Sequence, residues 1–219
     1  MTESTTKNES GIPSVMRAAQ QTNFGDVRDV LTIVDNVPIP RQLSSKQILI
    51  RAHAASINPA DWKIMSGMLS IFIRYSWPHI PGSDVAGEIV DMGPEVKRFR
   101  VGDHVYGNVG IGAGAFAEYV RADESLFALK PKNLTMEEAA AVPVACDTSY
   151  QALFHKVSPP IGKGSKIFIC GGSSACGLFA IQLAKAVGAS VATTCSQRNF
   201  QLMEKLGVSF FINSNDFSV

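Results

Sequence analysis

The sequence lacks the features that mark several common classes of protein. Its net charge is only +1, and the basic residues are scattered, so there is no field that would draw nucleic acid. No apolar run reaches the roughly 18 residues of a membrane span, because charges and glycines interrupt the longest candidates. We therefore expect a soluble chain with no nucleic acid and no membrane as partner.

Neither cysteine nor histidine occurs in a pattern that would hold a metal. The cysteines contain no C-x-x-C pair, and no histidine falls at i, i+4 from another ligand. The cysteines stand in apolar or glycine-rich surroundings, so we expect them to be reduced, buried, small residues of an intracellular protein. The residues concerned are Cys146, Cys170, Cys176 and Cys195, and His53, His79, His104 and His155.

The chain also lacks a recognisable targeting segment. Residues 1–12 are polar and include Glu3 and Glu9, which argues against a secretory signal and against an arginine-rich, acid-poor transit peptide. We predict a disordered tail over residues 1–14 and a cytoplasmic location.

The most informative feature that is present is a glycine-rich turn between an apolar strand and a helix, within residues 167–178. Small residues let the backbone approach a pyrophosphate, and the amides and dipole at the start of the helix favour negative charge. The alternative is an ordinary strand-to-helix turn in which glycine merely permits tight packing. We predict a dinucleotide phosphate site made by Gly172, Ser173, Ser174, Ala175, Cys176 and Gly177.

The next strand indicates which dinucleotide is bound. An NAD site usually offers a carboxylate to the ribose about 20 residues beyond the glycines, but there is no Asp or Glu from Leu178 to Met203. The strand is instead followed by Ser196, Arg198 and Asn199, and a guanidinium suits the 2′-phosphate of NADP. We therefore predict NADPH as the cofactor. The alternative for Arg198 is a solvated charge at the start of a helix.

The end of the chain reads as part of an α/β dinucleotide-binding domain. We predict a helix over residues 178–187, a strand over 190–194, a helix over 199–206 and a strand over 208–212. A six-stranded fold of this kind would need on the order of 100 further residues for its second half. We therefore expect a C-terminally truncated Rossmann domain, with a doubly wound parallel sheet, over residues 131–219.

Ahead of that domain the chain reads as short strands and turns. Strand candidates lie at residues 16–20, 47–55, 84–92, 103–106 and 116–121, which indicates a β-rich domain over residues 15–130. Thr135 and Glu138 have the spacing of a capping box and would begin a helix between the two domains. We place the boundary near Pro131.

Five blocks in this order resemble the medium-chain dehydrogenase/reductases, and within them the zinc-free, zeta-crystallin-like quinone oxidoreductases and enone reductases. The resemblance implies a GroES-like catalytic domain without its C-terminal return segment, a partial Rossmann domain, NADPH as cofactor, and reduction of a quinone or an α,β-unsaturated carbonyl. The blocks are residues 58–63, 81–87, 99–106, 114–119 and 171–177.

The resemblance also implies catalytic residues and the absence of zinc. Zinc-using members carry a cysteine where this chain has Asn58, and Gly-His-Glu where it has residues 82–84. In the zinc-free branch the residues matching Asn58 and Lys63 lie beside the nicotinamide and the substrate oxygen. Hydride delivery builds negative charge on that oxygen, so we predict that Lys63 supplies a cation and Asn58 an amide donor. The alternatives are a solvated loop lysine and an Asx turn before Pro59.

Three further residues are candidates for the cofactor site or the substrate pocket. Thr148 matches a family position near the nicotinamide end of the cofactor, with a simple helix cap as its alternative. Trp62 and Tyr75 are candidates for the wall of an apolar substrate pocket, although each is more often plain packing.

Two functions stay open on these grounds. The first is an NADPH-dependent, zinc-free reductase of quinones or enones, present here as a truncated form, for which a homodimer is possible at full length. The second is a non-catalytic remnant that serves as a weak nucleotide-binding or partner-binding module, using its unpaired sheet edge.

Overall fold

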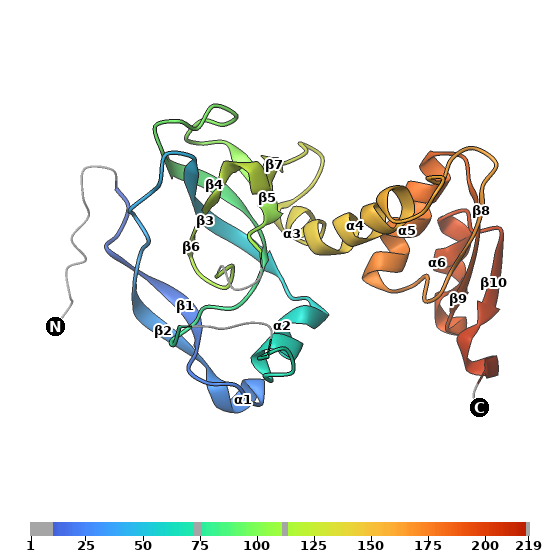
Figure 1. The fold of residues 1–219 in the computed structure, drawn as a ribbon, viewed down its shortest axis with the longest axis horizontal. Helices are drawn as coiled ribbons and strands as arrows, with labels where there is room; N and C mark the ends of the chain where they lie inside the picture. Colours follow the sequence, from blue (N-terminus) through green and yellow to red (C-terminus); the bar gives the residue numbers. More distant parts are fainter. Residues whose placement is uncertain (1–10, 72–75, 111–113, 218–219) are drawn as a thin grey trace. The chain divides into compact units, whose positions relative to one another are not determined.

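The computed structural model describes residues 11–71, 76–110 and 114–217, and the chain divides into two compact units (Figure 1). Unit 1 is Met1–Pro143 and unit 2 is Val144–Val219. The division falls later than the predicted boundary at Pro131, because helix α3 (Met136–Ala140) buries alanines against strand β4 (Asp84–Met92) of unit 1. The predicted tail extends too far, since Ile12 is buried in a core cluster of unit 1.

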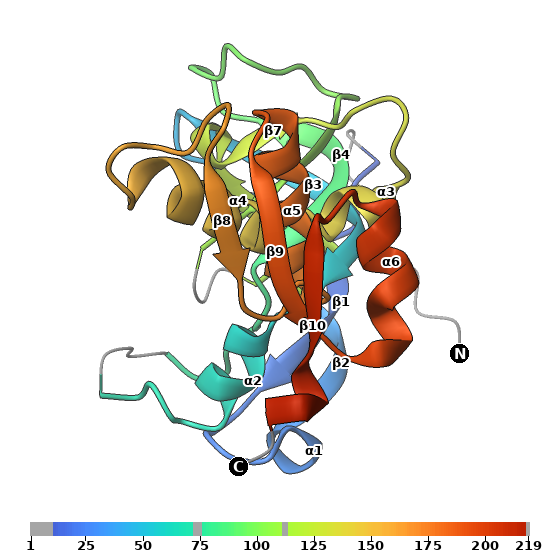
Figure 2. The ribbon, with the colours of Figure 1, turned by 90° about the vertical axis from the view of Figure 1, so that its right-hand side faces the viewer.

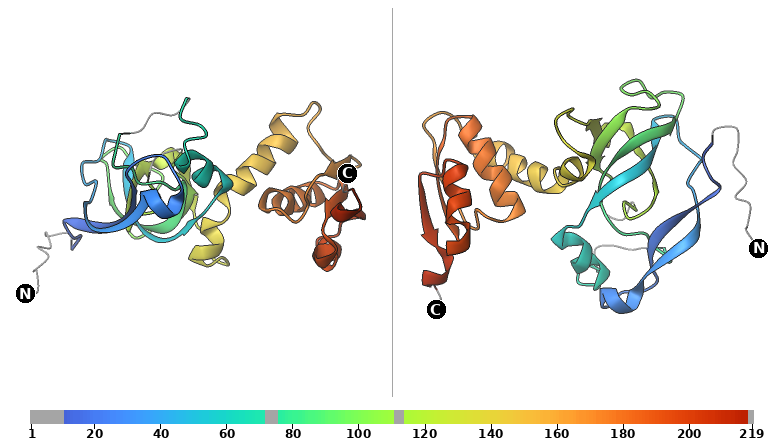
Figure 3. Two further views of the ribbon diagram at one scale, coloured as in Figure 1. Left: turned by 90° about the horizontal axis from the view of Figure 1, so that it is seen from below. Right: turned by 180° about the vertical axis from the view of Figure 1, so that it is seen from behind.

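Unit 1 is built from two antiparallel sheets. The smaller pairs β1 (Val15–Gln21) with β2 (Leu31–Pro38). The larger has the strand order β6-β3-β4-β5-β7, and the strands and loops of the unit curve round a common centre (Figure 3, left). Its other strands are β3 (Gln47–Ser56), β5 (His104–Asn108), β6 (Tyr119–Asp123) and β7 (Phe127–Leu129).

Strand β3 contributes to two apolar clusters of unit 1, because both of its faces are buried over residues 48–50. Ile48 and Ile50 lie in one apolar cluster, whereas Leu49 lies in a second cluster with Met16 and Val37. Side chains alternate between the faces of a strand, so consecutive apolar residues bury both faces at once. The described helices of this unit are short: α1 (Val27–Val30), α2 (Pro59–Met65), α3 and a 3-10 turn at Glu124–Leu126.

Unit 2 contains a parallel sheet with the order β10-β9-β8. This is the 3-2-1 order of the first half of a doubly wound dinucleotide fold, and it confirms the predicted α/β architecture. The sheet consists of β8 (Lys166–Ile169), β9 (Ser190–Cys195) and β10 (Phe210–Asn213), joined by α5 (Ala175–Ala186) and α6 (Phe200–Lys205). Ahead of it lie α4 (Pro143–Tyr150) and a π-helical turn at Gln151–His155, and 3-10 turns occupy Gln197–Asn199 and Ser214–Phe217.

Helices α5 and α6 cover one face of this sheet. Ile181 of α5 and Met203 of α6 are fully buried in a cluster with Val191 of β9. On the other face Phe168 and Phe210 both pair in register with Ala192, and they are 55% and 61% exposed. Figure 2 shows the three strands side by side with no helix of unit 2 across their front. Parallel sheets are ordinarily covered on both faces. The second face of this sheet differs, because its phenylalanines Phe168 and Phe210 are exposed.

None of the described helices has the length and apolar character that a bilayer crossing requires.

Candidate functional site

The glycine-rich turn is braced from inside by Ser174. Its hydroxyl accepts from the N–H of Gly177 at 3.0 Å and donates to the carbonyl of Gly171 at 2.7 Å. A Cβ on Gly177 would lie only 2.3 Å from that same carbonyl oxygen, so glycine permits the close approach of turn and helix. The side chain of Ser174 is therefore the N-cap of α5 and is used within the turn.

Three amides of this turn face no acceptor in the part of the chain that the structure describes. The N–H groups of Gly171 and Gly172 donate to Thr194. Within the described residues, those of Ser173, Ala175 and Cys176 donate to none. They stand at the start of a helix of 12 residues, where free amides and the helix dipole favour an anion. These groups fit a phosphate of a dinucleotide.

The end of β9 brings the other predicted cofactor residues to the same edge of the sheet. β8 and β9 run parallel, with Ile169 paired to Thr193, so the turn after β8 and residues 196–199 follow neighbouring strand ends. Arg198 is exposed and forms no ion pair with any residue in the described ranges. The side chain of Asn199 donates to the hydroxyl of Ser196 at 3.1 Å.

Thr148 lies inside α4 and is exposed, so the helix-cap alternative for it is wrong. Its buried neighbour Ser149, which the sequence analysis did not select, shares its one hydroxyl proton between the carbonyls of Ala145 and Cys176, each 2.8 Å from Oγ. This hydroxyl ties α4 to the first turn of α5.

In unit 1, Asn58 is held by a buried carboxylate. The side-chain amide of Asn58 donates to Oδ2 of Asp84 at 2.9 Å, and that of Asn108 donates to Oδ1 at 2.9 Å. Asp84 is fully buried, and Asn58 is only 7% exposed. One of the two side-chain N–H donors of Asn58 is thus already bonded to Asp84. Only the other N–H is left for the predicted hydrogen bond to a substrate.

Asn58 also begins helix α2 with a second buried carboxylate. Its backbone N–H donates to Oδ2 of Asp61 at 2.6 Å, and Pro59 occupies the first helical turn. Burial raises the pKa of Asp61, the charge of Asp84 adds to the rise, and the hydrogen bond from Asn58 opposes it. Asn58 is therefore the N-cap of α2, and the alternative of an Asx turn is wrong. The sequence signal for this cap is Asn58 followed by Pro59 and by an acidic residue, Asp61, three positions after the cap.

Lys63 lies on α2, the helix that Asn58 begins, and its predicted role beside the substrate stays a prediction. Lys63 is exposed on α2, and its ammonium lies 5.8 Å from the ring centroid of Trp62, which is 50% exposed. Tyr75 lies outside the described residues.

The cysteines do not all behave as predicted. Cys195 is buried, Cys146 and Cys176 are partly buried, and Cys170 is exposed because it begins the turn at the edge of the sheet. Burial raises the pKa of the Cys195 and Cys146 thiols, with the nearby Asp147 adding to the rise at Cys146. No group of three His, Cys, Asp or Glu residues within the described ranges is placed to hold a metal ion.

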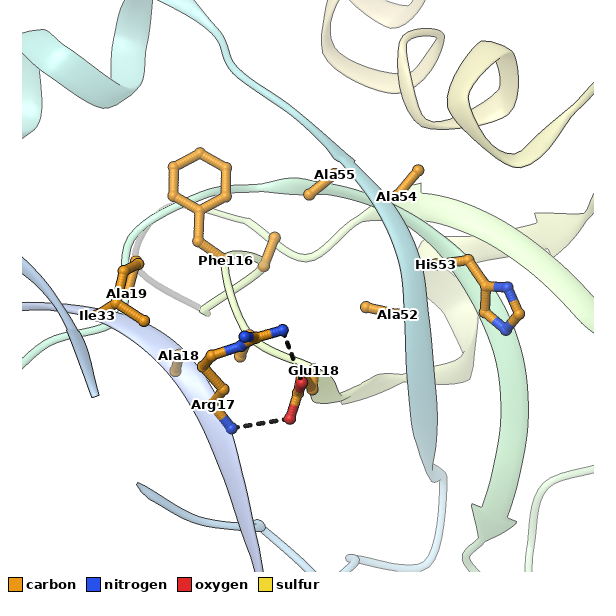
Figure 4. A pocket seen from close by; sticks show the side chains of 12 residues that line it. Arg17, Ala18, Ala19, Ile33, Ala52, His53, Ala54, Ala55, Phe116 and Glu118 are labelled. Carbon is orange, nitrogen blue, oxygen red and sulfur yellow. Dashed lines mark hydrogen bonds and ion pairs between the residues drawn. The ribbon is translucent and has the colours of Figure 1, made fainter. Parts of the chain in front are cut away.

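A cavity of about 340 Å³ in unit 1 lies between β1, β3 and residues 115–118 (Figure 4). Most of its lining is alanine. Its two charged residues are paired, since Arg17 donates from its backbone to Glu118 at 2.9 Å and contacts it from its guanidinium at 3.5 Å. The cavity therefore offers apolar volume without an unpaired charge, and none of the predicted site residues lines it.

These features define a class of protein: a GroES-like antiparallel domain followed by part of a dinucleotide-binding parallel sheet. Residues 44–132 match the alcohol dehydrogenase GroES-like domain family. Residues 44–132 thus belong to that domain family, and the chain is similar over almost its whole length to quinone oxidoreductases and enone reductases of the medium-chain dehydrogenase/reductase type.

Three of these relatives illustrate the similarity. A 2-methylene-furan-3-one reductase of Solanum lycopersicum is 40% identical over 95% of this chain and 54% of its own length. An NADPH-dependent alkenal/one oxidoreductase of Arabidopsis thaliana, a chloroplastic protein, is 37% identical over 94% and 54%. The structure of a quinone oxidoreductase from Coxiella burnetii, 32% identical, matches with a TM-score of 0.77 over 92% of this chain and 63% of that one. The chain thus spans little more than half the length of these curated relatives.

Proposed function

We propose that this chain provides the catalytic domain and the adenosine-binding half of the cofactor domain of an NADPH-dependent reductase of quinones or α,β-unsaturated carbonyls. The observation that carries the proposal is the edge of the unit 2 sheet, where three amides at the start of α5 without an acceptor among the described residues, and Arg198, follow the ends of two neighbouring parallel strands. The relatives are named for quinone, alkenal and furanone reduction. Their names support the substrate class.

Different residues would bind different parts of the dinucleotide. The amides of Ser173, Ala175 and Cys176 would hold the pyrophosphate, and Arg198, with Ser196 and Asn199 beside it, would hold the 2′-phosphate. NADPH supplies a hydride when it is bound. Thr148, on α4, stays a prediction for the nicotinamide end.

The residues of unit 1 would act on the substrate oxygen. Reduction of an enone or quinone builds negative charge on that oxygen, and the ammonium of Lys63 stabilises it. Asn58 has fewer groups left for the substrate, because Asp84 already accepts a hydrogen bond from one of its side-chain N–H groups. The remaining donor and the carbonyl oxygen of its amide can orient a bound group. We propose that no metal takes part, since Asn58, Ser83 and Asp84 stand where the family's zinc users carry metal-site residues.

The proposal is tested by turnover in two proteins. In the first, these 219 residues replace the matching part of the tomato relative, and NADPH oxidation is followed with a short enone and with a naphthoquinone. We expect saturable turnover with at least one substrate, and Lys63→Ala should lower kcat while Lys97→Ala, a substitution of an exposed lysine elsewhere in unit 1, should not. A chimera that binds NADPH but reduces neither substrate would contradict the proposal.

The second protein is the 219-residue chain alone. We expect turnover near background, because hydride transfer needs the nicotinamide and the substrate to be held closely and the described sheet of unit 2 has only three strands. Saturable turnover that Lys63→Ala abolishes would show that these residues suffice by themselves. The cytoplasmic location stays a prediction.

A further inference from the structure

Thr194 makes two hydrogen bonds to the glycine-rich turn. Its hydroxyl accepts from the N–H of Gly171 at 2.9 Å, and its backbone carbonyl accepts from the N–H of Gly172 at 2.9 Å. Two consecutive amides of the turn are therefore directed toward β9 and away from the side where a ligand would lie.

The neighbouring residue, Thr193, bonds to the end of β8 just before the turn and packs against Gly172 of the turn. The hydroxyl of Thr193 donates to the carbonyl of Ile169 at 2.6 Å, and Thr193 is fully buried. A Cβ on Gly172 would lie 2.3 Å from that hydroxyl oxygen. The end of β9 thus packs directly against the backbone of the turn.

These contacts sort the amides of the turn into two sets. The amides of Gly171 and Gly172 donate to Thr194. The amides of Ser173, Ala175 and Cys176 have no acceptor within the described residues. A set of free amides binds a phosphate well only if it is held in place before the ligand arrives, because ordering a mobile loop costs affinity.

We infer that Thr194 is a positioning residue of the phosphate-binding turn: its hydroxyl fixes Gly171 so that the three free amides are presented together to the 5′-phosphate of the adenosine. The inference rests on the proposed function, because it assumes that an adenine dinucleotide binds at this edge. Thr194 itself touches no phosphate in this arrangement, and its effect passes through the backbone of the turn.

The test uses the 219-residue chain and two nucleotides measured by calorimetry. Adenosine 2′,5′-bisphosphate carries the 5′-phosphate, whereas adenosine 2′-monophosphate lacks it and has only the 2′-phosphate that we assign to Arg198. Thr194→Val removes the hydroxyl while keeping the branched shape that suits a strand, and Thr194→Ser restores it. Thr32→Val, at an exposed position of β2, is the matched control.

We expect Thr194→Val to weaken the bisphosphate by about three- to tenfold, the effect of one net hydrogen bond, and to leave the monophosphate unchanged. Thr194→Ser should recover the affinity, and the Gly171 amide should exchange its hydrogen faster in the valine variant alone. Equal weakening of both nucleotides, or no weakening of the bisphosphate in a wild-type chain that binds it, overturns this inference alone. A wild-type chain that binds neither nucleotide overturns the proposed function and the inference with it.

Discussion

Asp84 is the residue on which the polar interior of unit 1 depends. Its carboxylate accepts from the amides of Asn58 and Asn108 at a fully buried position. Removing the carboxylate leaves the buried amide of Asn58 and the partly buried amide of Asn108 without this acceptor. An unpaired buried donor costs about 1–3 kcal/mol, and a partly buried one costs less because water can reach it. We expect Asp84→Ala to lower the free energy of unfolding by about 2–4 kcal/mol in urea denaturation. Asp91→Ala, at an exposed position of the same strand, should change it little, and equal effects would contradict this account.

His79 gives unit 1 a dependence on pH. Burial lowers its pKa below the ordinary value of 6.5, so the folded chain keeps the imidazole neutral where the unfolded chain takes up a proton. The unfolded state then binds more protons, and stability falls as pH drops from about 6.5 toward the lowered value. We expect urea midpoints to fall between pH 7.5 and 5.5, and to fall less in His79→Gln. The variant His155→Gln, which alters an exposed histidine, should behave as wild type, and an unchanged slope in His79→Gln would refute the assignment.

At the scale of elements, the turn between β8 and α5 depends on the absence of one side chain. Alanine is usually the better helix residue by about 1 kcal/mol, but a Cβ at Gly177 would lie 2.3 Å from the carbonyl oxygen of Gly171. We expect Gly177→Ala to destabilise the chain by about 1–3 kcal/mol and to abolish binding of adenosine 2′,5′-bisphosphate. Gly162→Ala meets no atom within 4 Å and should do neither. Bisphosphate binding that survives in Gly177→Ala would show that the close approach is not needed.

The elements that sequence analysis placed well are those with a strong local pattern. Strand β4 was predicted at its observed bounds, and the capping box of Thr135 and Glu138 is present at the start of α3. Strand β2 was missed, although Thr32, Ile33 and Val34 have the branched side chains that favour strands. The strand ends at Pro38, and proline is unfavourable within a strand because it lacks the N–H that a ladder hydrogen bond needs.

The sequence predicts the parts of the candidate site that follow one another closely along the chain. It does not predict contacts between residues that only the folded strands and helices bring together. The turn residues and Arg198 follow consecutive strands, so their spacing in sequence places them at one sheet edge. The partners of Asn58 could not be foreseen in the same way, because Asn108 reaches Asp84 across the register of two antiparallel strands. The second contact of Ser149, to the carbonyl of Cys176, likewise depends on how α4 packs on α5.

At the scale of the whole molecule, the uncovered face of the unit 2 sheet should govern how the chain behaves in solution. Phe168 and Phe210 are exposed in one row with Ala192, and exposed apolar patches promote association. We expect the 219-residue chain to self-associate with rising concentration in sedimentation velocity, and the double variant Phe168→Lys, Phe210→Lys to stay monomeric over the same range. A double variant in unit 1, Val101→Lys with Leu126→Lys, also replaces exposed residues and should not suppress association. If it does so equally, charge alone is responsible.

The central claim is that the edge formed by the turn and residues 196–199 recognises NADPH. Its most direct test is a calorimetric titration of the 219-residue chain with NADPH and NADH, in wild type and in Arg198→Ala, with Arg100→Ala as the matched control for an exposed arginine. A charge-assisted contact to the 2′-phosphate is worth about 1.5–3 kcal/mol, so the account predicts that wild type prefers NADPH. Arg198→Ala should lose about tenfold or more of NADPH affinity while NADH binding is unchanged. Equal losses for both cofactors, or no preference in wild type, would contradict it.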